Sequence, residues 1–259
     1  MMRTGPIPET DTDALLVAEG VTVGYGREAV VEDVTFTIRK GEFVALVGPN
    51  GSGKSTLLHA LLGVSAPWAG RVSLFGHPAT QVRDGRRVGY VPQRPSLGSE
   101  IPATVREIVA TGRLERGAWA RRATDADATA VVHAIRSVGL EDEADTPIHE
   151  LSAGQQQRAF IARAFAGEPG LLVLDEPIAG VDADSQRRFR DSLVHLIEEH
   201  GAGVLLVSHE LSAVASDLDR VLVLKRRLLF DGTPEDLAER GVSLGIHEED
   251  LPLWLEALR

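Results

Sequence analysis

The residues best suited to chemistry lie in a glycine-rich stretch, GPNGSGKS, at positions 48–55. It fits the pattern G-x-x-x-x-G-K-[ST], in which backbone N–H groups turn inward around phosphate oxygens. Lys54 can reach the β- and γ-phosphates of a nucleotide, and the Ser55 hydroxyl can ligate Mg²⁺. We expect these residues to bind the nucleotide: Gly48, Pro49, Asn50, Gly51, Ser52, Gly53, Lys54, Ser55 and Thr56.

Two adjacent carboxylates, Asp175 and Glu176, follow the apolar run LLVL. Such a run predicts a buried strand, with the two side chains at its exposed end. Asp175 suits the shell of Mg²⁺, usually through water, because this ion keeps much of its hydration. Glu176 would polarise the attacking water as a general base. Asp-Glu after a strand is commonplace alone, but together with the phosphate-binding loop it predicts a nucleoside triphosphatase.

A second stretch of small residues, LSAGQQQR at 151–158, lies far from the first, within a helical region. Ser152 is a good helix N-cap, and the small Ala153 and Gly154 expose the backbone amides of the first turn. This builds an anion site with no phosphate of its own. The economical interpretation is that it binds the γ-phosphate held by another copy of the chain. For this octapeptide alone, an ordinary capped helix is the alternative.

Composition limits the class of protein. The 259 residues are 43% hydrophobic and 25% charged, which is typical of a globular chain that buries a sizeable core. The net charge of −11 argues against nucleic acid as a partner. There is no cysteine, and the eight histidines are scattered without a tract. No stretch approaches the ~20 apolar residues of a spanning helix, so we expect a cytosolic chain that meets the membrane through a partner.

Hydropathy patterning predicts an α/β fold. Alternation of apolar and polar residues indicates strands within 15–26 and 29–48, and the pattern is helical from about 102 to 166. Apolar runs alternating with helix-like segments are typical of a buried parallel sheet. Further strands are expected at 71–76, 87–93, 171–176, 203–210 and 220–226.

In this order and at this spacing, the motifs resemble those of the ATP-binding subunits of ABC transporters, from about Tyr25 to Gly232. The resemblance implies a P-loop NTPase (RecA-like) core with an antiparallel β subdomain and an inserted all-helical subdomain. It also implies a role for each of several further residues: Tyr25 stacks on adenine, Gln93 senses Mg²⁺ and the permease, Ser152, Ala153, Gly154 and Gln155 form the signature loop, Asp182 crosses the dimer interface, and His209 contacts the γ-phosphate.

Composition, patterning and this resemblance together predict a division of the chain into five segments. They are a loose N-terminal tail at 1–13, the first part of the nucleotide-binding core with its β subdomain at 14–93, a helical subdomain with the signature loop at 94–167, the second part of the core at 168–235, and a C-terminal helical tail at 236–259. For the tail, a helix packed on the core and a regulatory contact are both open.

The family's mechanism is implied as well. Two copies sandwich two ATP molecules head to tail at the cytoplasmic face of the membrane, and the helical insert passes the motion to integral permease subunits. An extracytoplasmic metal-binding protein would take part indirectly. The catalytic residues would be Glu176, His209 and Lys54. The Mg²⁺ ion would be bound by Ser55, Gln93 and Asp175.

Two positions depart from the family pattern. Ala153 replaces the first glycine of the signature Leu-Ser-Gly-Gly-Gln, which matters only if that residue needs a positive φ. Ile178 stands where threonine is common, which removes one hydroxyl near the active site. We expect the signature site to work because Gly154 is present.

The cargo is indicated only by local similarity. The segments 88–113 and 171–186 look like those of the zinc/manganese importer ATPases. The alternatives are the ATPase of an iron–siderophore or cobalamin importer, or of an exporter. Outside transport, a nucleotide-regulated binding module without turnover is the rival class.

Overall fold

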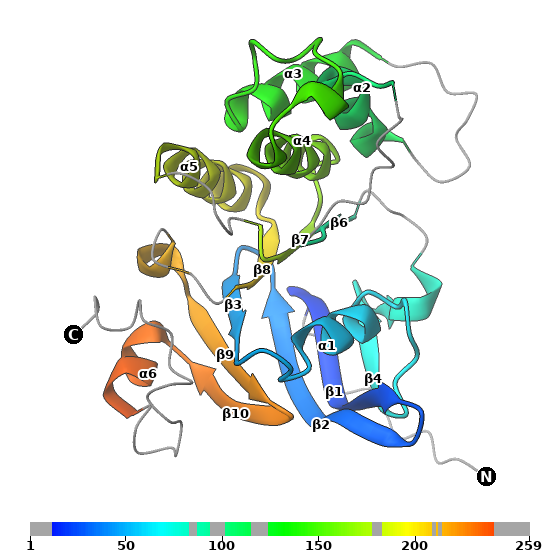
Figure 1. Cartoon of the computed structure of the whole chain (residues 1–259). Helices are drawn as coiled ribbons and strands as arrows, with labels where there is room; N and C mark the ends of the chain where they lie inside the picture. The colour runs from blue at the N-terminus through cyan, green and yellow to red at the C-terminus, as the bar shows by residue number, and fades with distance from the viewer. Residues whose placement is uncertain are drawn as a thin grey trace.

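The computed structural model of the chain describes residues 12–82, 87–93, 102–114, 124–177, 183–208, 211 and 214–240. These residues build two β-sheets and a group of helices that gathers at one end of the molecule (Figure 1). The strands are β1 (Ala14–Tyr25), β2 (Glu28–Arg39), β3 (Phe43–Val47), β4 (Ala69–Leu74), β5 (His77–Pro78), β6 (Val88–Val91), β7 (Leu171–Asp175), β8 (Gly203–Val207), β9 (Arg220–Lys225) and β10 (Arg227–Gly232). The helices are α1 (Lys54–Leu61), α2 (Val105–Ala110), α3 (Asp125–Ser137), α4 (Ala153–Ala166), α5 (Ala183–His200) and α6 (Pro234–Arg240). Short 3₁₀ turns lie at η1 (Ala79–Gln81), η2 (Thr111–Arg113), η3 (Ile148–Glu150) and η4 (Ala215–Asp217).

The larger sheet has the strand order β10-β9-β3-β8-β7-β6 and is parallel except for β10 at its edge. Every residue of β3, β7 and β8 is buried, as expected for a parallel sheet covered on both faces. Along β3, Phe43, Ala45 and Val47 join the core shared with the helices, whereas Val44 and Leu46 join the core shared with the smaller sheet. Packing on both faces therefore fixes the strand that leads into the glycine-rich loop.

The smaller sheet is antiparallel, in the order β2-β1-β4-β5. Burial along β1 and β2 largely alternates, because one face of each strand packs inward and the other meets solvent. The inward face shares a core with α1 and with the larger sheet. The helix α1, which follows the glycine-rich loop, is thus held between the two sheets.

The helical region packs α2, α3 and α4 on one another, and joins the larger sheet where α4 contacts β6. α5 contacts both α3 and β8, so it lies between the helical group and the sheet (Figure 1). A capping box begins each of α2, α3 and α4, with Thr104, Thr124 and Ser152 as the N-caps. Local sequence therefore sets where these helices start.

The structure confirms the predicted α/β fold with an antiparallel sheet and inserted helices, and adds detail. The predicted run 220–226 is β9 plus the turn of a hairpin, and the antiparallel β10 was not predicted. α6 crosses the predicted segment boundary at 235/236. Ile178, Asp182, His209 and the tail residues 241–259 lie outside the described residues. Within the described ranges, every helix is too short or too polar to cross a membrane.

Candidate active site

The glycine-rich loop connects the end of β3 to the start of α1, as the motif requires. Gly48 has a φ of 156°, and a Cβ atom there would lie 2.1 Å from the carbonyl oxygen of Leu224. Gly53 has a φ of 100°, and its Cβ atom would lie 2.4 Å from the side chain of Val31. Both positions need glycine, for backbone conformation and for close packing. The loop is therefore closely backed by the neighbouring strands.

Lys54 is the buried cation of this loop, with a side chain near the start of α1. Its Nζ donates hydrogen bonds to the carbonyl oxygens of Gly48, at 2.6 Å, and Pro49, at 3.1 Å. Burial lowers the pKa of the Lys54 ammonium, while the charges of Glu176 and Asp175 act in the opposite direction. Phosphate oxygens offer the same ammonium stronger, charged acceptors.

Asp175 is the last residue of β7 and is only 9% exposed, so the expectation that both carboxylates stand at an exposed strand end is wrong for this one. Burial, and then the charge of Glu176, raise the pKa of the Asp175 carboxyl, against the opposing effect of Lys54 and His59. A buried carboxylate with this imbalance favours a nearby cation.

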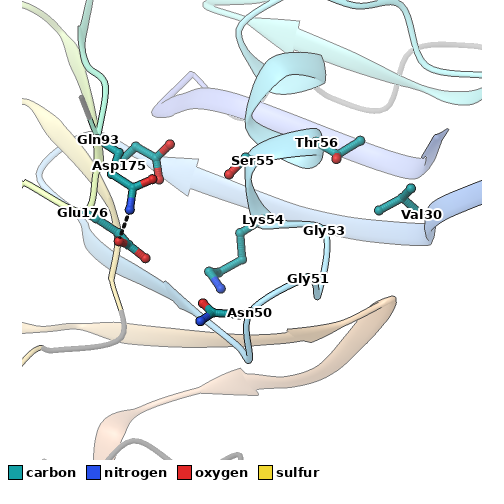
Figure 2. Close-up of a pocket in the computed structure, with 10 residues that line it drawn as sticks. All are labelled: Val30, Asn50, Gly51, Gly53, Lys54, Ser55, Thr56, Gln93, Asp175 and Glu176. Carbon is teal, nitrogen blue, oxygen red and sulfur yellow. Dashed lines mark hydrogen bonds between the residues drawn. The ribbon is translucent and has the colours of Figure 1, made fainter. Parts of the chain in front are cut away.

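Glu176 lies directly after β7 in a left-handed backbone conformation, with a φ of 47°. Its backbone N–H donates to the carbonyl oxygen of Val207, 2.7 Å away, which ties the residue to β8. The Gln93 side-chain amide, two residues beyond the end of β6, donates a short hydrogen bond to the Glu176 carboxylate (Figure 2). A non-glycine residue at such a φ is strained, and functional sites are where such strain gathers.

These side chains face one cavity of about 370 Å³ between the loop and the end of β7 (Figure 2). Its lining residues are Val30, Asn50, Gly51, Gly53, Lys54, Ser55, Thr56, Gln93, Asp175 and Glu176. All but one were predicted as site residues. Val30 was not, because a valine in an alternating strand is indistinguishable from a core residue until the β1–β2 hairpin places it beside the loop.

Comparison with known proteins is consistent with this geometry. The model of the family described as ABC transporter matches residues 31–179. The chain belongs to the ABC transporter family. It is 37% identical over 235 residues to the zinc uptake system ATP-binding protein ZurA of Listeria innocua. This match covers 89% of this chain and 91% of that protein.

Further relatives extend the ABC assignment. The chain is 38% identical over 215 residues to the high-affinity zinc uptake system ATP-binding protein ZnuC of Bacillus subtilis, covering 82% of this chain and 91% of that one. Among solved structures, it resembles the dimeric ATP-binding cassette MJ0796 bound to ADP and Pi, with a TM-score of 0.73 and 27% identity over 84% of this chain and 98% of that one. The chain is thus an ATP-binding cassette, an enzyme that hydrolyses ATP.

The predicted signature loop, Ser152 to Gln155, forms a regular helix start and does not line the cavity. The Ser152 hydroxyl accepts from the Gln155 N–H at 3.3 Å, and the Gln155 side chain accepts from the Ser152 N–H at 3.0 Å. Neither residue lines the cavity, and nor do Ala153 and Gly154. Ala153 is the first residue of α4 and does not have a positive φ, so the extra methyl group causes no backbone strain.

Tyr25, at the end of β1, is 64% exposed. Thr56 donates to its phenol oxygen at 3.5 Å, which places the ring beside the start of α1. Within the glycine-rich loop, the Ser52 Oγ is buried and has no hydrogen-bond partner in the described part of the chain. An exposed ring and an unpaired buried hydroxyl both leave room for a ligand.

Proposed function

We propose that this ABC ATPase energises zinc import, acting as a pair of copies bound to separate permease subunits at the cytoplasmic face of the membrane. The observation that carries the enzymatic part is the meeting of Lys54, Asp175 and Glu176 at one cavity, which joins a phosphate-binding cation to two carboxylates. The zinc part is supported by two relatives named for zinc uptake, each matched over more than four-fifths of this chain.

The loop would hold the ATP phosphates. Lys54 would exchange its two backbone acceptors for β- and γ-phosphate oxygens, and the buried Ser52 hydroxyl would gain the acceptor it lacks. The exposed Tyr25 ring would stack on adenine, with Val30 adding an apolar contact nearby. These groups bind and orient the nucleotide.

A Mg²⁺ site fits the same cavity because Ser55, Gln93 and Asp175 each bring an oxygen donor to it. The ion, when bound, would neutralise charge on the phosphates. Glu176 would accept the proton of the attacking water, and for this its carboxylate must leave the hydrogen bond from Gln93. We propose His209 and Asp182 as further contacts to the γ-phosphate and across the dimer.

The signature loop supports action between two copies. It lies outside the cavity of its own chain, and a Cβ atom at Gly154 would meet no atom within 4 Å. Nothing in the described part of the chain therefore requires glycine at this position, whereas close approach of a phosphate to the first turn of α4 would. We assign that phosphate to the ATP held by the partner copy, in line with the dimeric cassette that this chain resembles.

Zinc accumulation in a strain that lacks this gene tests the proposal. We expect accumulation from low external zinc to fall, to return with the wild-type gene, and not to return with the Glu176→Gln variant, which keeps the binding groups but lacks the general base. The matched control is Glu141→Gln, an exposed carboxylate of the helical region. Unchanged zinc uptake with a loss of manganese or iron-chelate uptake would overturn the cargo. Full rescue by Glu176→Gln would overturn the enzymatic mechanism.

A further inference from the structure

Three histidines from two helices meet where α3 contacts α5. His133 lies on α3, and His195 and His200 lie on the last turns of α5; all three are exposed. The ring centroids of His133 and His195 are 5.2 Å apart, and those of His195 and His200 are 6.0 Å apart. None of the three belongs to the nucleotide cavity. ATP hydrolysis therefore leaves this cluster without a role.

The spacing of the rings suits a shared metal ion. Two imidazoles on one tetrahedral zinc ion, with Zn–N bonds of about 2.0 Å, place their ring centroids about 5 Å apart. The His133–His195 pair already has this separation. The centroid distance of the His195–His200 pair is about 1 Å longer. Neither pair is stacked face to face, since the rings are inclined at 44° and 82°. Inclined rings can turn their nitrogen atoms towards a common point.

The end of α5 favours a cation. His200 is the last residue of α5, where the helix dipole gives negative potential. Glu198 and Glu199 precede it, and Glu199 lies four residues after His195, on the same side of the helix. Imidazole and carboxylate groups without thiolates suit zinc and similar divalent transition metals better than Mg²⁺ or Ca²⁺.

We propose that His133, His195 and His200 bind one divalent transition metal ion of the zinc class. In the described residues, no three histidine or acidic side chains are already gathered closely enough to hold a metal. On binding the ion, the exposed histidine rings would turn towards it, and the ring of His200 would move the most. Because exposed side chains change rotamer freely, this rearrangement needs no movement of the backbone.

The bound ion would join two parts of the molecule. α3 packs with α4, which carries the signature loop, whereas α5 packs on β8 of the sheet. The present link between α3 and α5 includes the Ser192 hydroxyl donating to the Ser137 carbonyl oxygen. Coordination from both helices would add a second, stronger link, and would restrict movement of the helical region relative to the sheet. Metal binding itself does not depend on which cargo the transporter carries.

Calorimetric titration of Zn²⁺ into the full, untagged, nucleotide-free protein tests the site. Excess Mg²⁺ in the buffer occupies carboxylate sites such as Asp175, which could otherwise bind zinc. We expect one tight equivalent, with an affinity that falls at least tenfold in His133→Ala and in His195→Ala. His77→Ala, which removes an exposed histidine of β5, should bind zinc as the wild type does. Equal affinity in all four proteins would overturn the proposal.

Two further measurements separate the site from indirect effects. Co²⁺ in place of zinc should give the intense visible absorption of a tetrahedral site in the wild type, and this should be lost in His195→Ala. Zinc should raise the melting temperature of the wild type but not of His133→Ala, because only in the wild type would the ion be held by both α3 and α5. Zinc binding that stabilises both proteins equally would place the ion elsewhere.

Discussion

At the scale of single residues, the cavity holds charges that the nucleotide-free chain accommodates poorly. Asp175 is buried beside a second carboxylate, and Lys54 is desolvated against loop carbonyls. Burial raises the pKa of the Asp175 carboxyl and lowers the pKa of the Lys54 ammonium, each towards its neutral form, as is common at functional sites. Binding of Mg²⁺ and ATP would supply the missing counter-charges.

Asp175→Asn should stabilise the nucleotide-free protein near neutral pH. Because the pKa of Asp175 is raised on folding, the folded state binds more protons than the unfolded state at pH values above 3.8, the ordinary pKa of this group. The free energy of unfolding of the wild type therefore falls as pH rises through that interval, and Asn removes this loss. Denaturant midpoints measured from pH about 5 to 8 should show a variant advantage that narrows towards acid.

The exposed Asp142→Asn is the control for this comparison, and its midpoint should follow the wild type at every pH. Asp175→Asn should at the same time weaken binding of Mg²⁺ and ATP, since it removes the proposed ligand charge. A variant less stable than the wild type at neutral pH would contradict the desolvation argument.

At the scale of elements, the capping boxes allow the signature loop to be tested apart from its structural role. Ser152→Ala removes the N-cap of α4 and should cost about 1 kcal/mol of stability. Thr124→Ala removes an equivalent cap from α3, with a similar expected loss. If Ser152 also meets ATP, only Ser152→Ala should lower the rate of ATP hydrolysis at saturating ATP, by tenfold or more. Equal rates of ATP hydrolysis in the two variants would mean that Ser152 acts only as a helix cap.

Elements marked by strong local signals were predictable from the sequence. The buried runs of β3, β7 and β8 are continuous apolar segments, and Ser152, as an N-cap residue, indicates the start of α4. The β9–β10 hairpin was not predicted because its turn residue is Arg226, with a φ of 63°, where glycine or asparagine would have signalled a turn.

Contacts between distant segments could not be predicted from the sequence, for a different reason. Asp175 proved buried because it still pairs with Val207 of β8 and its side chain faces Lys54 across the cavity, and this placement depends on the order of the strands. The histidines at 133, 195 and 200 seemed scattered because α3 and α5 meet only through tertiary packing. In both cases the residue types were visible, and the missing information was which elements are neighbours.

At the scale of the whole molecule, the question is whether one chain holds a complete site. Its cavity contains the phosphate loop and both carboxylates, while its signature loop lies elsewhere. A head-to-tail pair would complete two sites, each from the loop of one copy and the signature of the other. A single chain would then bind ATP but turn it over slowly.

Mixing two inactive variants distinguishes these arrangements. Lys54→Ala removes the phosphate-binding cation, and Ser152→Arg blocks the signature loop, so pairs of either variant alone have no intact site. A mixed pair has one intact site, made by Lys54 of one copy and Ser152 of the other. With random pairing of equal amounts, half the pairs are mixed and half of their sites work, so ATP hydrolysis should recover to about a quarter of the wild-type rate. No recovery on mixing, in proteins shown to pair, would mean that Lys54 and Ser152 serve the same ATP within one chain.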